Sequence, residues 1–286
     1  MKGTDMPKDH LDPPAAEHKF YVENGPIQLE HFNDTIFKTV NDDMRNFLKV
    51  KKKRKGRMGR CVGRSLIEPA VLESYKNWDN PWAILNANLQ KGLKVMDCGS
   101  GRGVLQFYLA SKGIDVHSID IGHNRSKIFR KIQTHLKKIG INFTINPYTV
   151  HKKLNKKYRT RVAFKMESAA ELSFANNTFD RIFCISVIEH MPDPVIAQSI
   201  KEMERVLKVG GLLLLTFDYH PEFNPDIIGF TKDDFYQKVL GNCHLIIANG
   251  DPDFTINNWP EYLREVNTFF RNKNPNTSFG VVLQKI

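Results

Sequence analysis

The chain has 286 residues, of which 41% are hydrophobic and 10% aromatic, so it can bury a large core and is not disordered as a whole. Its formal net charge of +11 is distributed unevenly. Residues 49–64 contain nine Lys and Arg, residues 123–165 contain thirteen, and neither tract contains an acid. The two tracts predict either a basic face or a Lys-rich surface that is simply solvated.

Membrane and metal-binding signals are weak in this sequence. No apolar run approaches the ~20 residues that a membrane span needs, and the opening MKGTDMPKDH lacks the apolar core of a secretory signal. The cysteines are far apart and form no CxxC pair, which disfavours a disulfide scaffold and a zinc site; they are Cys61, Cys98, Cys184 and Cys243. We therefore expect a cytoplasmic protein with no metal site and no transmembrane segment.

Composition divides the chain into three parts. Residues 1–25 are rich in Pro and charge and are predicted to be a flexible N-terminus. Residues 26–92, which include the first basic tract, are predicted to form a helical N-terminal cover, in which Asn80 and Pro81 are the N-cap and first position of a helix. Residues 93–286 alternate short apolar runs with amphipathic helices, which predicts an α/β domain with a mostly parallel sheet.

Seven strands are expected in this third part, at residues 93–98, 115–120, 162–166, 181–188, 212–217, 244–249 and 279–286. The last two can pair antiparallel at one edge of the sheet. Helices are expected at 104–109, at 128–139, from Asp193-Pro194 to a stop at Gly210-Gly211, and after a capping box of Thr231 and Asp234. Insertions are expected near 140–161, where Asn146-Pro147-Tyr148 is interpreted as a turn, and near 250–277.

The strongest motif is VMDCGSGRG (95–103), in which a buried strand carries Asp97 and glycines follow at 99, 101 and 103. Glycine allows a sharp turn and a close approach of a ligand to the backbone, and the N-terminus of the next helix favours an anionic group. The spacing differs from the GxGxxG of dinucleotide-binding folds, because Arg102 or Gln106 falls where the third glycine is needed. The pattern that fits is DxGxGxG.

The second expected strand also ends in an acid, Asp120, about 20 residues beyond the loop. A carboxylate at this place can accept hydrogen bonds from both hydroxyls of an adenosyl ribose. The alternative is an ordinary exposed aspartate at the end of a strand. The glycine loop at the right distance favours the ribose role.

Five segments in order resemble the class I S-adenosylmethionine-dependent methyltransferases, over roughly residues 80–286. They are VMDCGSGRG, SIDIG (118–122), ESAAELSF with NNTFDRIFCISVIEHMPDP (167–194), VLKVGGLLLLTF (206–217) and the terminal FGVVLQK. The nearest branch contains ubiquinone-biosynthesis-like small-molecule methyltransferases, in which a Glu-His pair often follows the fourth strand. The resemblance implies a Rossmann-like, seven-stranded, mostly parallel sheet with the last strand antiparallel, and S-adenosyl-L-methionine as cofactor.

The resemblance also implies which residues bind the cofactor. The set is Asp97, Gly99, Ser100, Gly101, Gly103, Asp120, Ile121, Ser168, Ala169 and Ser186. Within it, the glycines lie against the methionine part, Asp120 takes the ribose and Ile121 flanks the adenine. Ser168, preceded by Glu167, stands where the family usually offers an acid to the adenine amine. Either side chain could accept that hydrogen bond, and the backbone N–H of Ala169 could donate one.

Methyl transfer is an in-line displacement, so positioning supplies much of the catalysis, but an oxygen nucleophile must also lose a proton. His190 is the candidate general base, with Glu189 beside it, because histidine titrates near neutral pH. The alternative is that His190 only packs or caps the next helix. Asp218 and His220, after the fifth strand, are reserve candidates.

We expect methyl transfer to a hydroxyl group of a small-molecule, sugar or lipid-linked acceptor, including acceptors that carry an anionic group. The alternative is an RNA methyltransferase that binds nucleic acid through residues 49–64 and 123–165, where lysines alternate with tyrosines. A third hypothesis is a cofactor-binding regulator without turnover. The Glu-His pair at the reaction end favours an enzyme.

Overall fold

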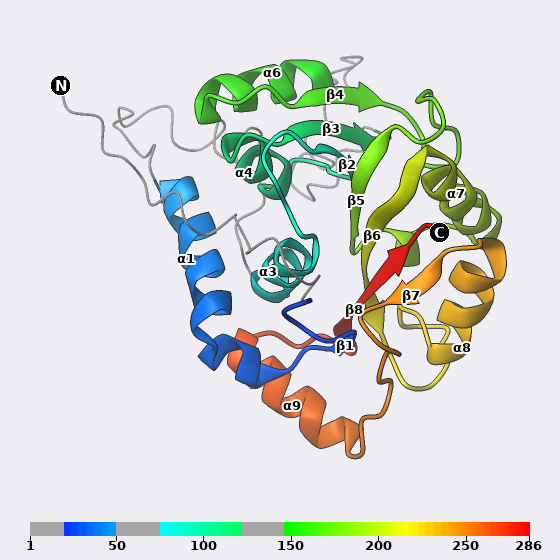
Figure 1. Ribbon diagram of the computed structural model, residues 1–286. Helices are drawn as coiled ribbons and strands as arrows, with labels where there is room; N and C mark the ends of the chain where they lie inside the picture. Colours follow the sequence, from blue (N-terminus) through cyan, green and yellow to red (C-terminus); the bar gives the residue numbers. More distant parts are fainter. Residues whose placement is uncertain (1–19, 50–74, 122–145) are drawn as a thin grey trace, which may run out of the picture.

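The computed structural model describes residues 20–49, 75–121 and 146–286 (Figure 1). Several expected features lie outside the described residues. They are most of the flexible N-terminus, the first basic tract beyond Lys49, and the helix expected at 128–139.

Eight strands of the described chain form one mixed sheet in the order β1-β8-β6-β5-β2-β3-β4, with β7 also paired with β8 (Figure 1). Their bounds are β1 Gly25–Pro26, β2 Lys94–Cys98, β3 Asp115–Asp120, β4 Ala163–Met166, β5 Phe179–Ile185, β6 Leu207–Tyr219, β7 Ile246–Ala248 and β8 Thr277–Gln284. Neighbouring strands from β2 to β6 are parallel, whereas β8 is antiparallel to β6, β7 and β1. The predicted sheet is confirmed, and the two-residue β1 adds a strand that was not expected.

Helices cover both faces of the sheet (Figure 1). One face packs against the helices α1 Thr35–Lys49, α3 Lys76–Asn86, α4 Leu105–Ser111, α6 Pro147–Tyr158 and α9 Trp259–Phe270. The other face packs against α7 Asp193–Val206 and the run of α8 Lys232–Asp234, η3 Phe235–Val239 and η4 Leu240–Asn242. Two short turns, η1 Leu29–Asn33 and η2 Ile188–His190, complete the set. In the described part of the chain, no helix is both long enough and apolar enough to cross a lipid bilayer.

Alternation along the strands builds the two cores. In β5, Phe183 enters the core under α3 and α4, whereas Ile182 and Cys184 enter the core under α7. The register places Cys98 of β2 opposite Ile119 and Cys184. The carboxyl ends of the parallel strands therefore meet at one edge, where ligands bind in open α/β sheets.

Helix α3 begins earlier than the sequence predicted. The expected N-cap and first residue, Asn80 and Pro81, lie inside a helix that starts at Lys76. Proline has no N–H to donate to the carbonyl four residues back, which belongs to Asn77. The side-chain amide of Asn41 in α1 donates to this carbonyl instead, at 2.8 Å. A partner from a distant helix thus makes the internal proline tolerable, which no local pattern could reveal.

The stop expected at Gly210-Gly211 is also wrong. Helix α7 ends at Val206, and β6 starts at Leu207 and runs through both glycines. Sheet pairing accounts for this, because Leu207 pairs with Phe179 and the Gly210 N–H donates to the carbonyl of Lys285 at 2.7 Å.

Two capping patterns had different outcomes. The capping box of Thr231 and Asp234 is confirmed at the start of α8. The turn expected at Asn146-Pro147-Tyr148 is instead the start of α6, where the Asn146 side chain accepts a hydrogen bond from the Tyr148 N–H at 2.9 Å and Pro147 is the first helical residue.

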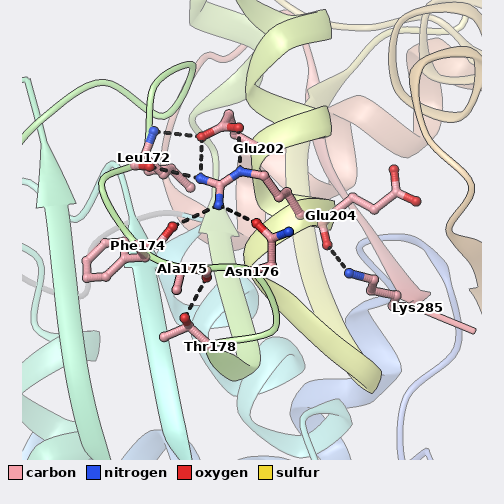
Figure 2. Close-up of polar contacts among 9 residues, drawn as sticks. Leu172, Phe174, Ala175, Asn176, Thr178, Glu202, Glu204 and Lys285 are labelled. Atoms are coloured by element: carbon pink, nitrogen blue, oxygen red, sulfur yellow. Dashed lines mark hydrogen bonds and ion pairs between the residues drawn. The ribbon is translucent and has the colours of Figure 1, made fainter.

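Arg205 of α7 ties the segment before β5 to this helix; Figure 2 labels its partners Leu172, Phe174 and Glu202. Its guanidinium donates to the Glu202 carboxylate at 2.7 Å and to the carbonyls of Leu172 and Phe174 at 2.9 and 2.8 Å. Glu202 in turn accepts the Leu172 N–H at 2.8 Å. These charge-assisted bonds fix the path of the chain between β4 and β5.

Candidate active site

The glycine loop leaves β2 in a backbone conformation that favours glycine. The φ angle is +67° at Gly99 and +51° at Gly101. A Cβ atom added at Gly99 would come within 2.6 Å of the Val187 side chain, so the loop packs tightly against the segment that follows β5. The N–H of Gly103 donates to the Ser100 carbonyl at 2.8 Å and closes the turn before α4.

Gly101 is held by side chains through both of its backbone polar groups. Its N–H donates to Oδ2 of Asp120, at the end of β3, at 3.0 Å. Its carbonyl oxygen lies 3.0 Å from Nε2 of His151 in α6. The structure therefore brings the two predicted elements, the loop and Asp120, into direct contact. Sequence analysis missed His151, which lies in the expected insertion.

Gln106 connects the loop to the neighbouring strand. Its fully buried side-chain amide donates to the carbonyl of Gly103 at 3.2 Å. Its oxygen accepts the hydroxyl of Ser118 at 2.7 Å, in the middle of β3. Gln106, which stands where a GxGxxG motif would need its third glycine, therefore links the glycine loop to β3.

Helix α3 adds a cation and a carboxylate to this edge of the sheet. The Lys76 Nζ donates to the Ile185 carbonyl at 3.1 Å and to the Ser186 hydroxyl at 2.9 Å, and lies 3.1 Å from Oδ2 of Asp79. The buried Asp79 also accepts the hydroxyls of Ser186 and Ser278. Ser186 was predicted from the sequence. Lys76 and Asp79 were missed because the misplaced N-cap put both outside the helix.

Three further carboxyl groups at this edge have raised pKa values. Burial raises the pKa of Asp97 to about 7, that of Glu189 to about 8 and that of Asp218 to about 6. The charge of Asp120 adds to the effect at Asp97, and that of Asp218 adds to it at Glu189. The positive charge of Lys76 opposes all three shifts. The edge therefore presents a negative, partly protonated cluster to a ligand.

The two predicted catalytic residues face different surroundings. Glu189 is buried, and its Oε1 accepts the Asp218 N–H at 3.3 Å while its Oε2 is buried without a hydrogen-bond partner. His190, the next residue in η2, is exposed. The reserve candidate His220 contacts the ring of Trp259, with ring centroids 5.0 Å apart, and its Nδ1 lies 2.6 Å from the Glu222 carbonyl.

The residues predicted to surround an adenine follow β3 and β4. Ile121 is exposed and lies directly after Asp120. Ser168 forms a turn in which its hydroxyl accepts the Ala170 N–H at 3.2 Å, while Ala169 is buried. The Glu167 carboxylate accepts the hydroxyl of Ser173 through Oε2, and its Oε1 is buried without a hydrogen-bond partner. Their adenine contacts stay predictions.

The sheet order, the glycine loop after β2 and the acid at the end of β3 agree with the class I S-adenosylmethionine-dependent methyltransferase domain that the sequence predicted. Residues 96–215 match the protein family described as "Methyltransferase domain". The match covers less than half of the chain; over these residues it supports a methyltransferase domain with S-adenosylmethionine as its cofactor.

Three curated relatives align with part of the chain. It is 30% identical over 163 residues to Methyltransferase GfsG of Streptomyces halstedii, which is 56% of this chain and 48% of that protein. It is 30% identical over 127 residues to Ubiquinone biosynthesis O-methyltransferase of Leptothrix cholodnii, 44% of each chain. It is 32% identical over 102 residues to tRNA U34 carboxymethyltransferase of Campylobacter curvus, 35% of this chain and 34% of that protein. The chain spans about half or less of these relatives.

The residues present fit this cofactor. A Cβ added at Gly101 would point toward Oδ2 of Asp120, 3.9 Å away, so the bare glycine leaves room beside the carboxylate predicted to take the ribose. The Ser100 hydroxyl in the same loop is buried without a hydrogen-bond partner. The surrounding carboxyl groups suit a ligand that carries a sulfonium and an ammonium charge.

Proposed function

We propose that this protein transfers the methyl group of S-adenosylmethionine to a hydroxyl oxygen of a small-molecule acceptor. The arrangement that carries the proposal is the meeting, at one edge of the sheet, of the glycine loop, Asp120 and the buried carboxyl group of Glu189. The loop and Asp120 bind and orient the cofactor, which supplies an electrophilic methyl group. Glu189 takes the proton from the acceptor hydroxyl.

Glu189 suits the proton transfer better than His190. Its Oε2 is buried and lacks a partner, and a hydroxyl group could donate to it. The Asp218 N–H holds the other oxygen in place. The pKa of about 8 makes the ionised form a stronger base than an ordinary carboxylate. Lys76 already lowers this pKa, and any further positive charge bound nearby would favour ionisation more.

A cavity beyond β6 supports a small acceptor. It has a volume of about 300 Å³. One of its lining residues is His220, which follows Asp218 by two positions in the sequence. Its lining includes the apolar side chains of Phe223, Ile227 and Phe230. Pockets for small molecules are typically about this size or larger; the lining here also includes polar and charged side chains, among them Asn224, Asp234 and Lys238. The name of the O-methyltransferase relative supports an oxygen acceptor.

The first prediction concerns the ribose contact. Asp120→Ala should weaken binding of S-adenosylhomocysteine by at least about tenfold, or about 1.4 kcal/mol, measured by calorimetry. The control is Asp115→Ala, which removes an exposed carboxylate at the opposite end of β3 and should leave the affinity unchanged. Unchanged affinity in the Asp120 variant would remove this residue from the ribose role. Equal binding of NAD would contradict the proposal as a whole.

The acceptor class is best found by transferring a labelled methyl group from the cofactor into a fractionated lysate. The small-molecule or lipid pool should take up the label. Label in the RNA pool alone would favour a second candidate function, RNA methylation. One observation supports that candidate: α6 and the segment after it expose basic side chains with no acid nearby in sequence, namely Lys152, Lys153, Lys156, Arg159 and Arg161. The name of the tRNA-modifying relative agrees with it.

A further inference from the structure

A buried histidine of α6 makes a polar contact with the glycine loop. His151 has 3% of its surface exposed, and its Nε2 lies 3.0 Å from the carbonyl oxygen of Gly101. Because a carbonyl only accepts hydrogen bonds, Nε2 must carry the proton. Burial lowers the pKa of this ring to about 4, so the imidazole is neutral at physiological pH. It is therefore a fixed tautomer with one donor, aimed at the loop.

The position of this donor is set by aromatic packing. The imidazole stacks on the ring of Phe164 in β4, with centroids 3.7 Å apart and planes at 9°. The ring of Phe107 in α4 lies 5.9 Å away. The remaining nitrogen, Nδ1, is buried without a hydrogen-bond partner. An apolar ring would fill this space without leaving a buried polar atom unpaired, so packing alone does not explain a histidine here.

The contact completes a two-sided hold on one residue, Gly101, through the two peptide groups that flank its Cα atom. Asp120 accepts the N–H of Gly101 from β3, and His151 donates to its carbonyl from α6. The φ angle of +51° at Gly101 is accessible to glycine, but glycine also has many other conformations open to it. Two side chains on separate elements therefore select one conformation of a flexible residue. Such preorganisation lowers the entropy that ligand binding would otherwise lose.

We propose that His151 is a positioning residue that holds Gly101, and with it Asp120, in the conformation that binds the adenosyl ligand. This inference rests on the proposed function. It gives the expected insertion a role in the cofactor site: α6 connects the edge strand β4 to the loop after β2.

The test distinguishes the hydrogen bond that His151 donates from the packing of its aromatic ring. His151→Phe keeps an aromatic ring between Phe164 and Phe107 but removes the donor. In His151→Gln, the side-chain amide nitrogen reaches about as far as Nε2 and restores a donor. His151→Asn is polar, but its amide is too short to reach the carbonyl. All three variants are compared with the unaltered full chain in thermal melting, to confirm that they fold.

Two measurements follow. Affinity for S-adenosylhomocysteine should fall about tenfold in His151→Phe and His151→Asn and stay within threefold of the unaltered protein in His151→Gln, with KM for the cofactor changing more than kcat. In the ligand-free protein, amide hydrogen exchange at Gly101 and Gly103 should speed up about tenfold in His151→Phe. Exchange at Gly210, whose N–H is bonded far away to Lys285, should not change.

The outcomes decide between positioning and packing. Unchanged affinity and unchanged loop exchange in His151→Phe would overturn the inference, as would a His151→Gln variant as weak as His151→Phe. If the unaltered protein did not bind S-adenosylhomocysteine at all, the proposed function would fail instead. The exchange measurement on the ligand-free protein would then still show whether His151 holds the loop.

Discussion

Adjacent residues in one short turn acquire opposite environments at this site. The turn η2 buries Glu189 and exposes His190. Ordinary side-chain chemistry favours histidine as a base near neutral pH, which is why the sequence indicated His190. Burial changes that comparison, because it raises the pKa of the glutamate to about 8. Which of two neighbours is buried depends on the packing of η2, and the sequence pattern EH does not contain that information.

This contrast gives a prediction for Glu189→Gln. The amide keeps the shape of the side chain but cannot accept a proton, so turnover should fall by about 10²-fold or more while affinity for S-adenosylhomocysteine stays near that of the unaltered protein. The control is Glu265→Gln, which changes an exposed carboxylate on α9. Full activity of Glu189→Gln together with an inactive His190→Gln would return the role of base to the histidine.

The pH dependence of the reaction follows from the same group. A base must be ionised, and the raised pKa means that this carboxyl is mostly protonated below pH 8. The rate should therefore rise with pH, about tenfold per unit well below the pKa of Glu189, and level off above it; the positive charge of the bound cofactor places this levelling below pH 8. Rates from pH 6 to 9.5 at saturating cofactor would show this. A rate that stays constant between pH 6 and 9.5 would mean that Glu189 is not the titrating base.

At the residue level, the sequence predicted the parts of the site that are local. The glycine loop, Asp97 and Asp120 could each be predicted because they lie at or next to the end of an apolar strand. The structure places them at the same edge of the sheet. Lys76 and His151 could not be found in this way, because each is brought to the site by a helix that is distant from it in sequence. Neither lies in a motif, and their contacts exist only after the helices pack.

At the level of elements, most errors concern boundaries; the strand β1 and the helix α6 are elements that the sequence did not predict. The strands were predicted well because buried parallel strands form continuous apolar runs. The start of α3 was misplaced because Asn80-Pro81 is a good local start signal that tertiary contacts override. The contact that matters is the hydrogen bond from Asn41 to the Asn77 carbonyl, 36 residues apart in sequence.

That contact makes a double-mutant prediction. Asn41→Ala leaves the Asn77 carbonyl without its donor and should cost about 1–3 kcal/mol of unfolding free energy, measured by urea denaturation. In a Pro81→Ala background the new N–H at position 81 can donate to the same carbonyl, so the Asn41→Ala change should cost at least about 1 kcal/mol less. Strictly additive effects would show that the two residues do not share this carbonyl.

At the scale of the whole molecule, charge is divided between two regions. The carboxyl edge of the sheet gathers acids around one lysine. The outer face of α6, together with Lys165 of β4, exposes basic side chains, and residues 146–166 contain no acid. The acidic edge suits a cationic cofactor. The basic face lies on the same helix that positions His151, so any large anion bound there would lie near the cofactor loop.

Salt dependence distinguishes the two acceptor classes. Each phosphate that a protein neutralises releases counterions, so six or more contacts would cost about 10³-fold in affinity between 50 and 200 mM salt. We predict that binding of a single-stranded RNA, followed by fluorescence anisotropy, loses about tenfold or less over this range, as expected for one or two contacts. The cavity beyond β6 is sized for a small molecule, and α6 is anchored to the sheet through His151, Leu154 and Tyr158 without needing RNA.

The same experiment on a variant makes the conclusion specific to this face. Changing Lys152, Lys153 and Lys156 together to Gln removes three exposed charges and leaves the buried face of α6 intact. If the basic side chains are only solvated, the salt dependence and the turnover of a small acceptor should both stay unchanged. The opposite result would be a steep salt dependence of RNA affinity in the unaltered protein and a smaller slope in this variant, corresponding to about three fewer phosphate contacts. That result would identify α6 as a binding surface for RNA. The acceptor would then be a nucleotide of that RNA.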